Sequence, residues 1–339
     1  MAGGIGSRFW PMSTSELPKQ FIDILGTGRT LIQMTWDRFA PLCPPERCWV
    51  VTSEAYVPLV RAQLPQIPES NILAEPASRN TAPCIALASW KIAAKDPDAN
   101  VVVTPADALV LDSKDYLNTI SEALAFTAEH DSIVTVGITP TRPETGYGYI
   151  QASSSIPAEG KILKVSHFRE KPDIVTARSY LQAGGYLWNA GIFVWSVGTI
   201  VDALRCFAPQ IAGKADEIAA EGFSPEALKR IFPQCDKISI DYAVMEKHPG
   251  IYTIPGNFGW SDLGTWGSLL QNSVRDEEGN ASIGHGIGLH GCSDCVVHVD
   301  GLTQVELEGL KGYIVAYSDG RLLVCRLSEE QRIKDFIEK

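Results

Sequence analysis

Through the first 275 residues, short apolar runs alternate with stretches of helical spacing. Apolar runs bounded by polar or glycine-containing segments are typical of buried strands. We expect strands at 48–52, 71–74, 101–104 and 132–138. We expect helices between them at 54–64, 81–95 and 115–129, with Thr81 as the N-cap of the second. This order predicts a parallel sheet covered by helices on both faces, with ligands beyond the carboxyl ends of the strands.

The pattern is less regular further along the chain. It predicts strands with some antiparallel pairing at 147–151, 161–168, 187–195 and 251–254. It predicts helices at 201–219, 225–231 and 240–247. The polar turn 275–280 marks a boundary, because brief apolar pairs interrupted by glycines follow it up to residue 324. We therefore expect an α/β domain at 1–275 and a small β-solenoid-like domain at 276–339, with a helix at 329–338.

Composition narrows the class of protein. The 339 residues can bury a sizeable core, since 45% are hydrophobic and only 20% are charged. A net charge of −11 argues against non-specific binding to nucleic acid or to anionic membranes. No apolar run is long enough for a membrane span, and the eight cysteines are too scattered for a disulfide scaffold. These features favour a cytoplasmic protein.

Glycine and positive charge come together in the first 21 residues. Lys19 lies beyond a proline-bracketed segment, and Arg8 closely follows three glycines, Gly3, Gly4 and Gly6. Glycines let backbone N–H groups close around an anion, arginine supplies a bidentate fork, and lysine supplies a mobile charge. This combination suits a polyphosphate, although a plain glycine turn with two solvated cations would give the same pattern. The dinucleotide fingerprint is not met, because Phe9 stands in place of its third glycine, and the P-loop ending is absent.

Several motifs together resemble the sugar-nucleotide pyrophosphorylases, and most closely the mannose-1-phosphate guanylyltransferases. The opening motif of that family, GGxGxR followed by PKQ, reads here as Gly3–Arg8 and Pro18–Gln20. The stretch Glu75-Pro-Ala-Ser-Arg-Asn-Thr-Ala-Pro83 is similar to the nucleotide loop of guanylyltransferases. The resemblance implies a Rossmann-like three-layer nucleotidyltransferase domain with a mixed sheet, a small C-terminal left-handed β-helix-like domain, and a homodimer.

Asp107 and Asp262 are the candidate metal ligands. Mg²⁺ favours one or two carboxylates together with phosphate oxygens, and nucleotidyl transfer needs a divalent ion to neutralise the triphosphate. Taken singly, Asp107 could end a strand and Asp262 could cap a helix at 263–270. The motifs Pro105-Ala-Asp107 and Trp260-Ser-Asp262 match the family's two metal-binding aspartates, so the resemblance implies that both bind Mg²⁺.

The substrate sites follow from the same resemblance. Glu75, Arg79 and Asn80 are implied to recognise the base and ribose of GTP, although each is by itself an ordinary loop residue. The sugar-phosphate motifs are Thr145–Tyr149, Phe168–Pro172 and Asn189–Phe193. They supply Gly146 for close approach, Glu170 and Asn189 for sugar hydroxyls, and Lys171 for the phosphate. A surface Glu-Lys pair and a β-bulge are the alternative interpretations of these motifs.

The implied reaction is a direct substitution. The phosphate oxygen of α-D-mannose 1-phosphate attacks the α-phosphorus of GTP in line and gives GDP-mannose and pyrophosphate. No general base is needed, because a sugar phosphate is already an anion, so catalysis is positioning and charge neutralisation. Arg8 would hold the departing pyrophosphate, Lys19 would stabilise charge at the α-phosphate, and Lys171 would anchor the nucleophile.

Other functions remain open. A nucleotidyltransferase for another sugar or base fits the same motifs. A catalytically silent regulatory subunit should lack Arg8, Lys19 or one of the metal aspartates, yet all four residues are present. A Rossmann oxidoreductase fits least, for want of the third glycine and of the strand before it.

The start of the chain departs from the family. An apolar strand precedes the glycine loop in the family, whereas here Met1 stands where that strand would end. We expect either an upstream extension or a sheet without a central strand, which would expose backbone groups on both neighbours and leave the chain poorly stable. At the other end, there is no room after residue 339 for the isomerase domain of some relatives, so a bifunctional enzyme is not expected.

The carboxyl-terminal region contains a second candidate metal site. Cys292 and Cys295 are spaced as C-x-x-C beside three histidines, at His285, His290 and His298. Such spacing can hold zinc. In a β-solenoid, however, alternate residues point inward, where cysteine acts as a small apolar filler. We expect the filler role.

Overall fold

The computed structural model describes residues 1–4, 6–153 and 161–337. The α-helices of this part are α1 (Leu31–Phe39), α2 (Val57–Gln63), α3 (Thr81–Ala93), α4 (Ser113–Glu129), α5 (Ile174–Ala183), α6 (Val197–Phe207), α7 (Pro209–Ala220), α8 (Pro225–Ile231), α9 (Trp266–Asn272) and α10 (Ile333–Ile337). Its strands are β1 (Val50–Ser53), β2 (Ile72–Glu75), β3 (Asn100–Val103), β4 (Leu109–Val110), β5 (Ile133–Ile138), β6 (Tyr149–Ala152), β7 (Leu163–Arg169), β8 (Tyr186–Ser196), β9 (Ile251–Gly256), β10 (Trp260–Ser261), β11 (Ala281–Ile283), β12 (Ile287–His290), β13 (Val296–Val299), β14 (Val305–Glu308), β15 (Tyr313–Ser318) and β16 (Arg321–Arg326).

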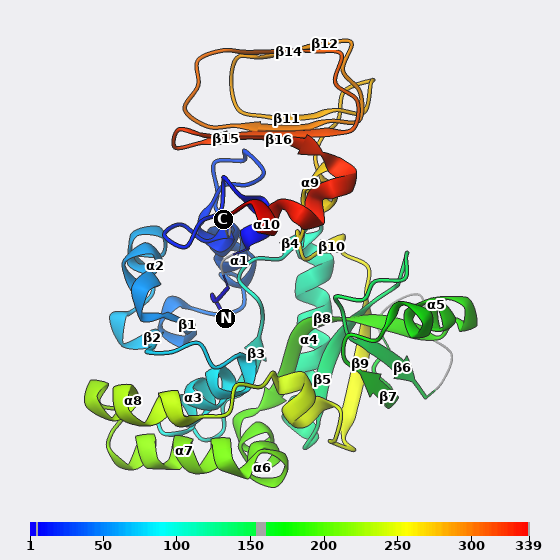
Figure 1. Cartoon of the computed structure of the whole chain (residues 1–339). Coiled ribbons are helices and arrows are strands. Elements are labelled where there is room, and N and C mark those ends of the chain that lie inside the picture. The colour runs from blue at the N-terminus through cyan, green and yellow to red at the C-terminus, as the bar shows by residue number, and fades with distance from the viewer. Residues whose placement is uncertain (5, 154–160, 338–339) are drawn as a thin grey trace.

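A six-stranded mixed sheet with the order β3-β8-β5-β9-β7-β6 forms the centre of the fold, between helices (Figure 1). Successive side chains of β8 point to opposite faces of the sheet. Ile192 and Val194 pack with Ile120 of α4, whereas Phe193 and Trp195 pack with residues of α3 and α6. Because both faces are buried, the strand is apolar along most of its length rather than alternating. The predicted three-layer α/β arrangement with a mixed sheet is confirmed.

The central sheet is less parallel than the sequence pattern indicates. β5 pairs in parallel with β9, but β8 lies antiparallel between β3 and β5. Periodicity within a segment does not show which distant strand pairs with it, so this insertion was missed. Two local predictions were also wrong. Asn80, not Thr81, is the N-cap of α3, and the helical stretch at 201–219 is divided where Pro209 begins α7.

The amino-terminal residues lie between the six-stranded sheet and a separate two-stranded sheet, β1–β2. The Ala2 N–H donates to the Val51 carbonyl of β1 at 2.8 Å. On the other side, the Ala106 N–H donates to the Met1 carbonyl at 2.9 Å, and the Met1 amino group donates to the Thr104 carbonyl at 2.9 Å. Residues 1–2 therefore make strand-like bonds to both neighbours.

Next to Met1, a cavity of about 750 Å³ separates β1 from β3. Mainly apolar side chains of β1, β3, α1, α3 and α4 line it. The β1–β2 sheet is separate from the six-stranded sheet, and both the missing strand and the poor stability of the chain stay predictions.

The last strands stack at one end of the molecule (Figure 1). β11, β13 and β15 pair in parallel, β12 pairs in parallel with β14, and β16 returns antiparallel along β15. One face of β13 and β15 joins the same apolar cluster as Phe9 and Trp266, whose rings lie 5.2 Å apart. The carboxyl-terminal strands therefore pack directly on the segment that carries the glycine loop. Of the helix expected at 329–338, the structure has α10, and Glu338 lies outside the described residues.

The cysteines and histidines of the tail point in different directions. Cys292 and Cys295 are buried among apolar residues between the strands, and their thiols donate to the carbonyls of Leu307 and Leu310. His298 lies on the opposite face, against the Trp266 ring, where burial lowers its pKa to about 4. Within residues 1–4, 6–153 and 161–337, no cluster of three or more His, Cys, Asp or Glu side chains could hold a metal. In the same ranges, no helix is long and apolar enough to cross a membrane.

Candidate active site

A short antiparallel ladder brings the two candidate metal aspartates together. β10 pairs with β4, so that Ser261 lies opposite Leu109. Asp262 directly follows β10 and Asp107 lies two residues before β4, which places both carboxylates at the same end of this ladder. Two segments more than 150 positions apart in the sequence therefore meet at one point, as the motif comparison implied.

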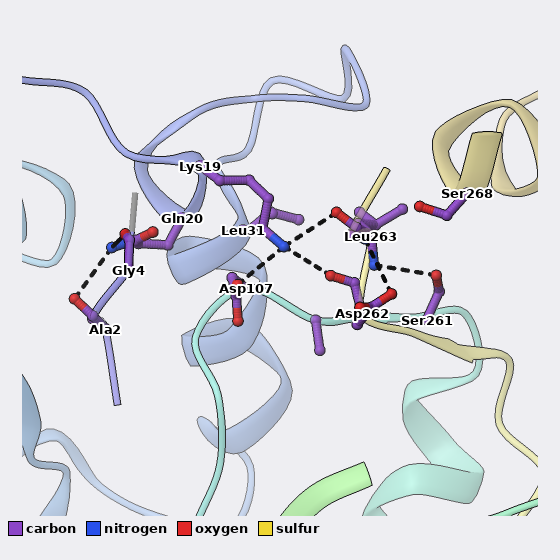
Figure 2. Close-up of polar contacts among 12 residues, drawn as sticks. Ala2, Gly4, Lys19, Gln20, Leu31, Asp107, Ser261, Asp262, Leu263 and Ser268 are labelled. Atoms are coloured by element: carbon purple, nitrogen blue, oxygen red, sulfur yellow. Dashed lines mark hydrogen bonds and ion pairs between the residues drawn. The ribbon is translucent and has the colours of Figure 1, made fainter. Parts of the chain in front are cut away.

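Lys19 lies between these two segments and bonds to both. Its ammonium group is 3.0 Å from Asp107 Oδ2, and it donates to the carbonyls of Asp262 at 2.7 Å and Leu263 at 3.2 Å (Figure 2). The residue is only 5% exposed. A buried cation is tolerable only when it is paired and hydrogen-bonded, and here it has three oxygen partners. Lys19 therefore links the Asp107 segment to the Asp262 segment at this end of the β4–β10 ladder.

The opening loop lies beside Lys19. Gly6 has a positive φ of 70°, and a Cβ there would come within 2.8 Å of the Lys19 side chain, so the close approach requires glycine. Nε2 of Gln20 donates to the carbonyls of Ala2 and Gly4 and so holds the loop in place (Figure 2). Gly3, Gly4 and Arg8 are exposed. The loop therefore offers open backbone groups and a guanidinium on its solvent side.

The candidate nucleotide loop begins where β2 ends. Asn80 has a positive φ of 67°, and its side chain accepts from the Thr81 N–H, which fixes the start of α3. Burial raises the pKa of the Glu75 carboxyl to about 7, and Glu75 Oε1 is buried without a hydrogen-bond partner among the described residues. Arg79 Nε is likewise buried and unpartnered there. Buried polar atoms of this kind are costly unless a further group pairs with them.

The sugar-phosphate candidates form a second buried polar cluster. The Asn189 side chain accepts from the Thr135 hydroxyl and donates to Asp241 Oδ1, both at 2.9 Å. Glu170 is buried, and its N–H donates to Glu246 Oε1 at 2.9 Å. Burial, and then the nearby Asp241 carboxylate, raise the pKa of Glu170 to about 7. Burial also raises the pKa of Asp241.

Positive charge is scarce in this second cluster. Lys171 Nζ lies 3.2 Å from Glu170 Oε1, but the lysine side chain is 55% exposed. Its backbone φ is +43°, an uncommon value for a residue with a side chain. Strain of this kind is often retained where the position of a side chain matters for function.

Three residues near these clusters were missed from the sequence. Asp241 looks like an ordinary helix residue, but a π-helical turn at Asp241–Met245 directs it to Asn189. Gly148 rather than Gly146 lies against the cluster, since a Cβ on Gly148 would come within 2.5 Å of Glu170 Oε2. Gly146 is exposed and faces Glu144. The third, Tyr147, donates from its hydroxyl to Asp262 Oδ1 at 2.6 Å.

The residues at the ladder fit a divalent cation. Asp107 and Asp262 provide two carboxylates at one end of the ladder, where Lys19 pairs with the Asp107 carboxylate. Two protein carboxylates with water and substrate phosphates are a usual set for Mg²⁺, which keeps several waters. The donor set at the ladder is therefore chemically suited to a hard cation that arrives with a phosphate ligand.

Comparison with known proteins defines the class. The sequence profile of the nucleotidyl transferase family matches residues 1–279. The mannose-1-phosphate guanylyltransferase of Salmonella montevideo is 37% identical over 351 residues, which cover 100% of this chain and 72% of that protein. The xanthan biosynthesis protein XanB of Xanthomonas campestris is 37% identical over 347 residues, with the same shares of the two chains.

The structural comparison agrees. A crystal structure described as a mannose-1-phosphate geranyltransferase of Thermus thermophilus has a TM-score of 0.90 and 32% identity, over 100% of this chain and 97% of that one. This chain belongs to the nucleotidyl transferase family. The resemblance to the mannose-1-phosphate guanylyltransferases is confirmed. Members of this family generally use a divalent metal ion.

Proposed function

We propose that this chain makes GDP-mannose and pyrophosphate from GTP and α-D-mannose 1-phosphate. Its full-length similarity to proteins named mannose-1-phosphate guanylyltransferase supports the choice of sugar and base. The observation that carries the proposal is the meeting of Lys19, Asp107 and Asp262 at one end of the β4–β10 ladder. A silent regulatory subunit has no need of such a buried charged centre, so we favour an enzyme.

The proposed mechanism is a direct in-line displacement. The phosphate of mannose 1-phosphate is the nucleophile, and no protein group needs to remove a proton from it. Mg²⁺, held by Asp107 and Asp262, would supply charge neutralisation for the triphosphate. Lys19 would exchange its bond to Asp107 for the α-phosphate, and Arg8 would bind the departing pyrophosphate. Each of these groups acts by position and charge.

Recognition of the two substrates is assigned to the two remaining clusters. Backbone groups of the opening loop at Gly3, Gly4 and Gly6 would cradle the triphosphate. Glu75, Arg79 and Asn80 would contact the base and ribose, which would satisfy the unpartnered buried atoms of Glu75 and Arg79. The sugar-phosphate residues are Gly146, Glu170, Lys171 and Asn189. Mannose hydroxyls can donate to the acidic cluster, while Lys171 reaches the phosphate.

The finer organisation is also a proposal. We assign residues 1–275 to the catalytic domain, and 276–339 to a left-handed β-helix-like domain with a carboxyl-terminal helix. The parallel pairing of β11, β13 and β15 supports the second assignment. Family resemblance supports Mg²⁺ as the metal and a homodimer as the assembly. All eight cysteines are free thiols, which supports a reducing compartment such as the cytoplasm.

A substrate panel tests this proposal. The purified protein is incubated with each of GTP, ATP, dTTP and UTP against mannose 1-phosphate and glucose 1-phosphate, and pyrophosphate release is measured. We expect the highest kcat/KM for GTP with mannose 1-phosphate. A higher value for another pair would assign a different nucleotidyltransferase activity, and no release with any pair would favour the regulatory subunit.

A further inference from the structure

Tyr147 joins the sugar-phosphate cluster to the metal aspartates. Its hydroxyl donates to Asp262 Oδ1 at 2.6 Å, across 115 positions of sequence. The Asp262 carboxylate also accepts from the Gly264 N–H, again through Oδ1, at 3.0 Å. Among the described residues, Tyr147 is the only side chain that bonds this carboxylate, because Lys19 bonds the Asp262 carbonyl instead. The orientation of the carboxylate thus depends on one phenol and one backbone N–H group.

The Tyr147 ring is held independently of its hydroxyl. It packs edge-on against Trp188 of β8 at 5.2 Å and against Trp260 of β10 at 5.4 Å. The Arg142 guanidinium in turn lies over the Trp188 ring, 5.3 Å from its centroid. Aromatic contacts of this kind fix a ring by packing, so removal of the hydroxyl alone should leave the ring in place.

The backbone next to Tyr147 belongs to the sugar-phosphate cluster. The Gly148 carbonyl accepts from the Asn189 N–H at 2.8 Å, and the Gly148 Cα faces Glu170 so closely that a Cβ would collide with it. A ligand that bonds Glu170 and Asn189 must therefore lie beside the peptide that follows Tyr147. One residue connects the place where the sugar phosphate is proposed to bind with the carboxylate that is proposed to hold the cation.

We propose that Tyr147 is a positioning residue that orients Asp262 for a divalent cation and couples cation binding to occupancy of the sugar-phosphate cluster. Because the Tyr147 hydroxyl and the Gly264 N–H both bond Oδ1, we assign the other carboxylate oxygen, Oδ2, to the cation. This inference rests on the proposed function. It adds to that function a physical link by which binding of a ligand at the sugar-phosphate cluster changes the affinity of the metal site for its cation.

The test is direct measurement of Mn²⁺ binding, by electron paramagnetic resonance of the free ion, with and without mannose 1-phosphate. Tyr147→Phe keeps the ring and removes the hydroxyl. We expect it to weaken Mn²⁺ binding about tenfold or more, as for loss of one hydrogen bond to a charged group, and to reduce the effect of mannose 1-phosphate on Mn²⁺ affinity. Its melting temperature should stay within about 2 °C of the unsubstituted protein.

Tyr149→Phe is the matched control, because the Tyr149 hydroxyl accepts from the Glu144 N–H in the same loop and does not bond Asp262. It should leave Mn²⁺ affinity unchanged. Equal Mn²⁺ affinity in Tyr147→Phe and the unsubstituted protein would overturn the role of Tyr147, as would equal losses in both variants. Failure of the proposed function can be distinguished from failure of the role of Tyr147. In the first case the unsubstituted protein would bind Mn²⁺ and mannose 1-phosphate without making GDP-mannose, or would bind neither.

Discussion

The two buried polar clusters of the active site differ in how their charge is compensated. At the β4–β10 ladder, Lys19 is buried and has three oxygen partners from both aspartate segments. In the sugar-phosphate cluster, Glu170, Asp241 and Glu246 lie close together, and the nearby Lys171 is more than half exposed. Burial raises the pKa values of both Glu170 and Asp241, and repulsion by the Asp241 carboxylate raises that of Glu170 further.

This difference indicates different modes of assembly. The ladder cluster is ordered by folding, because its own lysine pairs with the Asp107 carboxylate and holds the Asp262 segment through two backbone carbonyls. The acidic cluster is left with excess negative charge, which burial makes costly. Sugar hydroxyls can donate to these carboxylates and lower that cost. We infer that the first cluster is preorganised and that the second is completed by its ligand.

Loss of Lys19 should have the largest effect. Lys19→Met leaves Asp107 without its ion pair and removes a positive charge from the α-phosphate, so kcat should fall about 10²- to 10³-fold. The melting temperature should fall as well, because the substitution removes the three bonds that the buried Lys19 ammonium makes between the two aspartate segments. Steady-state kinetics and a thermal melt check both. Lys171→Met is the matched comparison: it should lower activity and lower the melting temperature by less, because Lys171 is more than half exposed and makes a single ion pair, with Glu170. Normal turnover in Lys19→Met would refute its role.

Asp262→Asn should act mainly through the metal. The amide keeps the shape of the side chain but removes one of two carboxylates, so the Mg²⁺ concentration for half-maximal activity should rise about tenfold or more. An Mg²⁺ titration of the initial rate measures this. Asp202→Asn, on the exposed face of α6, is the control and should behave as the unsubstituted protein. Unchanged metal dependence in Asp262→Asn would remove this residue from the site.

Glu170→Gln should raise the stability of the protein at pH 8 and at the same time weaken the binding of mannose 1-phosphate. The native pKa of about 7 lies above the usual value near 4.5, so between these pH values the native state binds more protons than the unfolded chain. The free energy of unfolding therefore falls as pH rises through this window. At pH 8 the substitution should raise the free energy of unfolding by about 1 to 2 kcal/mol, since each pKa unit corresponds to about 1.4 kcal/mol.

The same substitution should raise KM for mannose 1-phosphate about tenfold, because an acceptor for a sugar hydroxyl is weakened. Urea unfolding at pH 5 and pH 8 measures the stability effect, which should be smaller at pH 5. Glu122→Gln, on the exposed surface of α4, should change neither quantity. A Glu170→Gln protein that is less stable at pH 8 would contradict the view that this cluster carries uncompensated charge.

The smallest expected effects are those of substitutions at two glycines near the sugar-phosphate cluster. Gly148→Ala would place a methyl group 2.5 Å from Glu170 Oε2, whereas Gly146→Ala meets only the Glu144 side chain, at 3.2 Å. We expect a severalfold rise in KM for mannose 1-phosphate from Gly148→Ala and little change from Gly146→Ala. The reverse order would restore Gly146 as the residue of close approach.

Part of this picture could be predicted from the sequence. The β-branched runs indicated the positions of β1, β3 and β5, since a strand buried on both faces must be apolar. Family motifs indicated Asp107, Asp262 and Lys19, and the structure brings these three residues together, while their roles stay predictions. Asp241 could not be found in this way, because it lies outside the family motifs and its partner is 52 positions away. Tyr147 lies within the motif Thr145–Tyr149, but its bond to Asp262, 115 positions away, depends on tertiary structure. The insertion of β8 between β3 and β5 likewise depends on tertiary pairing, which periodicity does not encode.

The central claim is a single in-line displacement on GTP at the preorganised cluster. The most direct test uses one diastereomer of guanosine 5′-O-(1-thiotriphosphate) with mannose 1-phosphate, followed by determination of the configuration at the thio-substituted phosphorus of the product. Direct attack predicts inversion at this phosphorus. Retention would show two displacements through a covalent enzyme intermediate and would contradict the account.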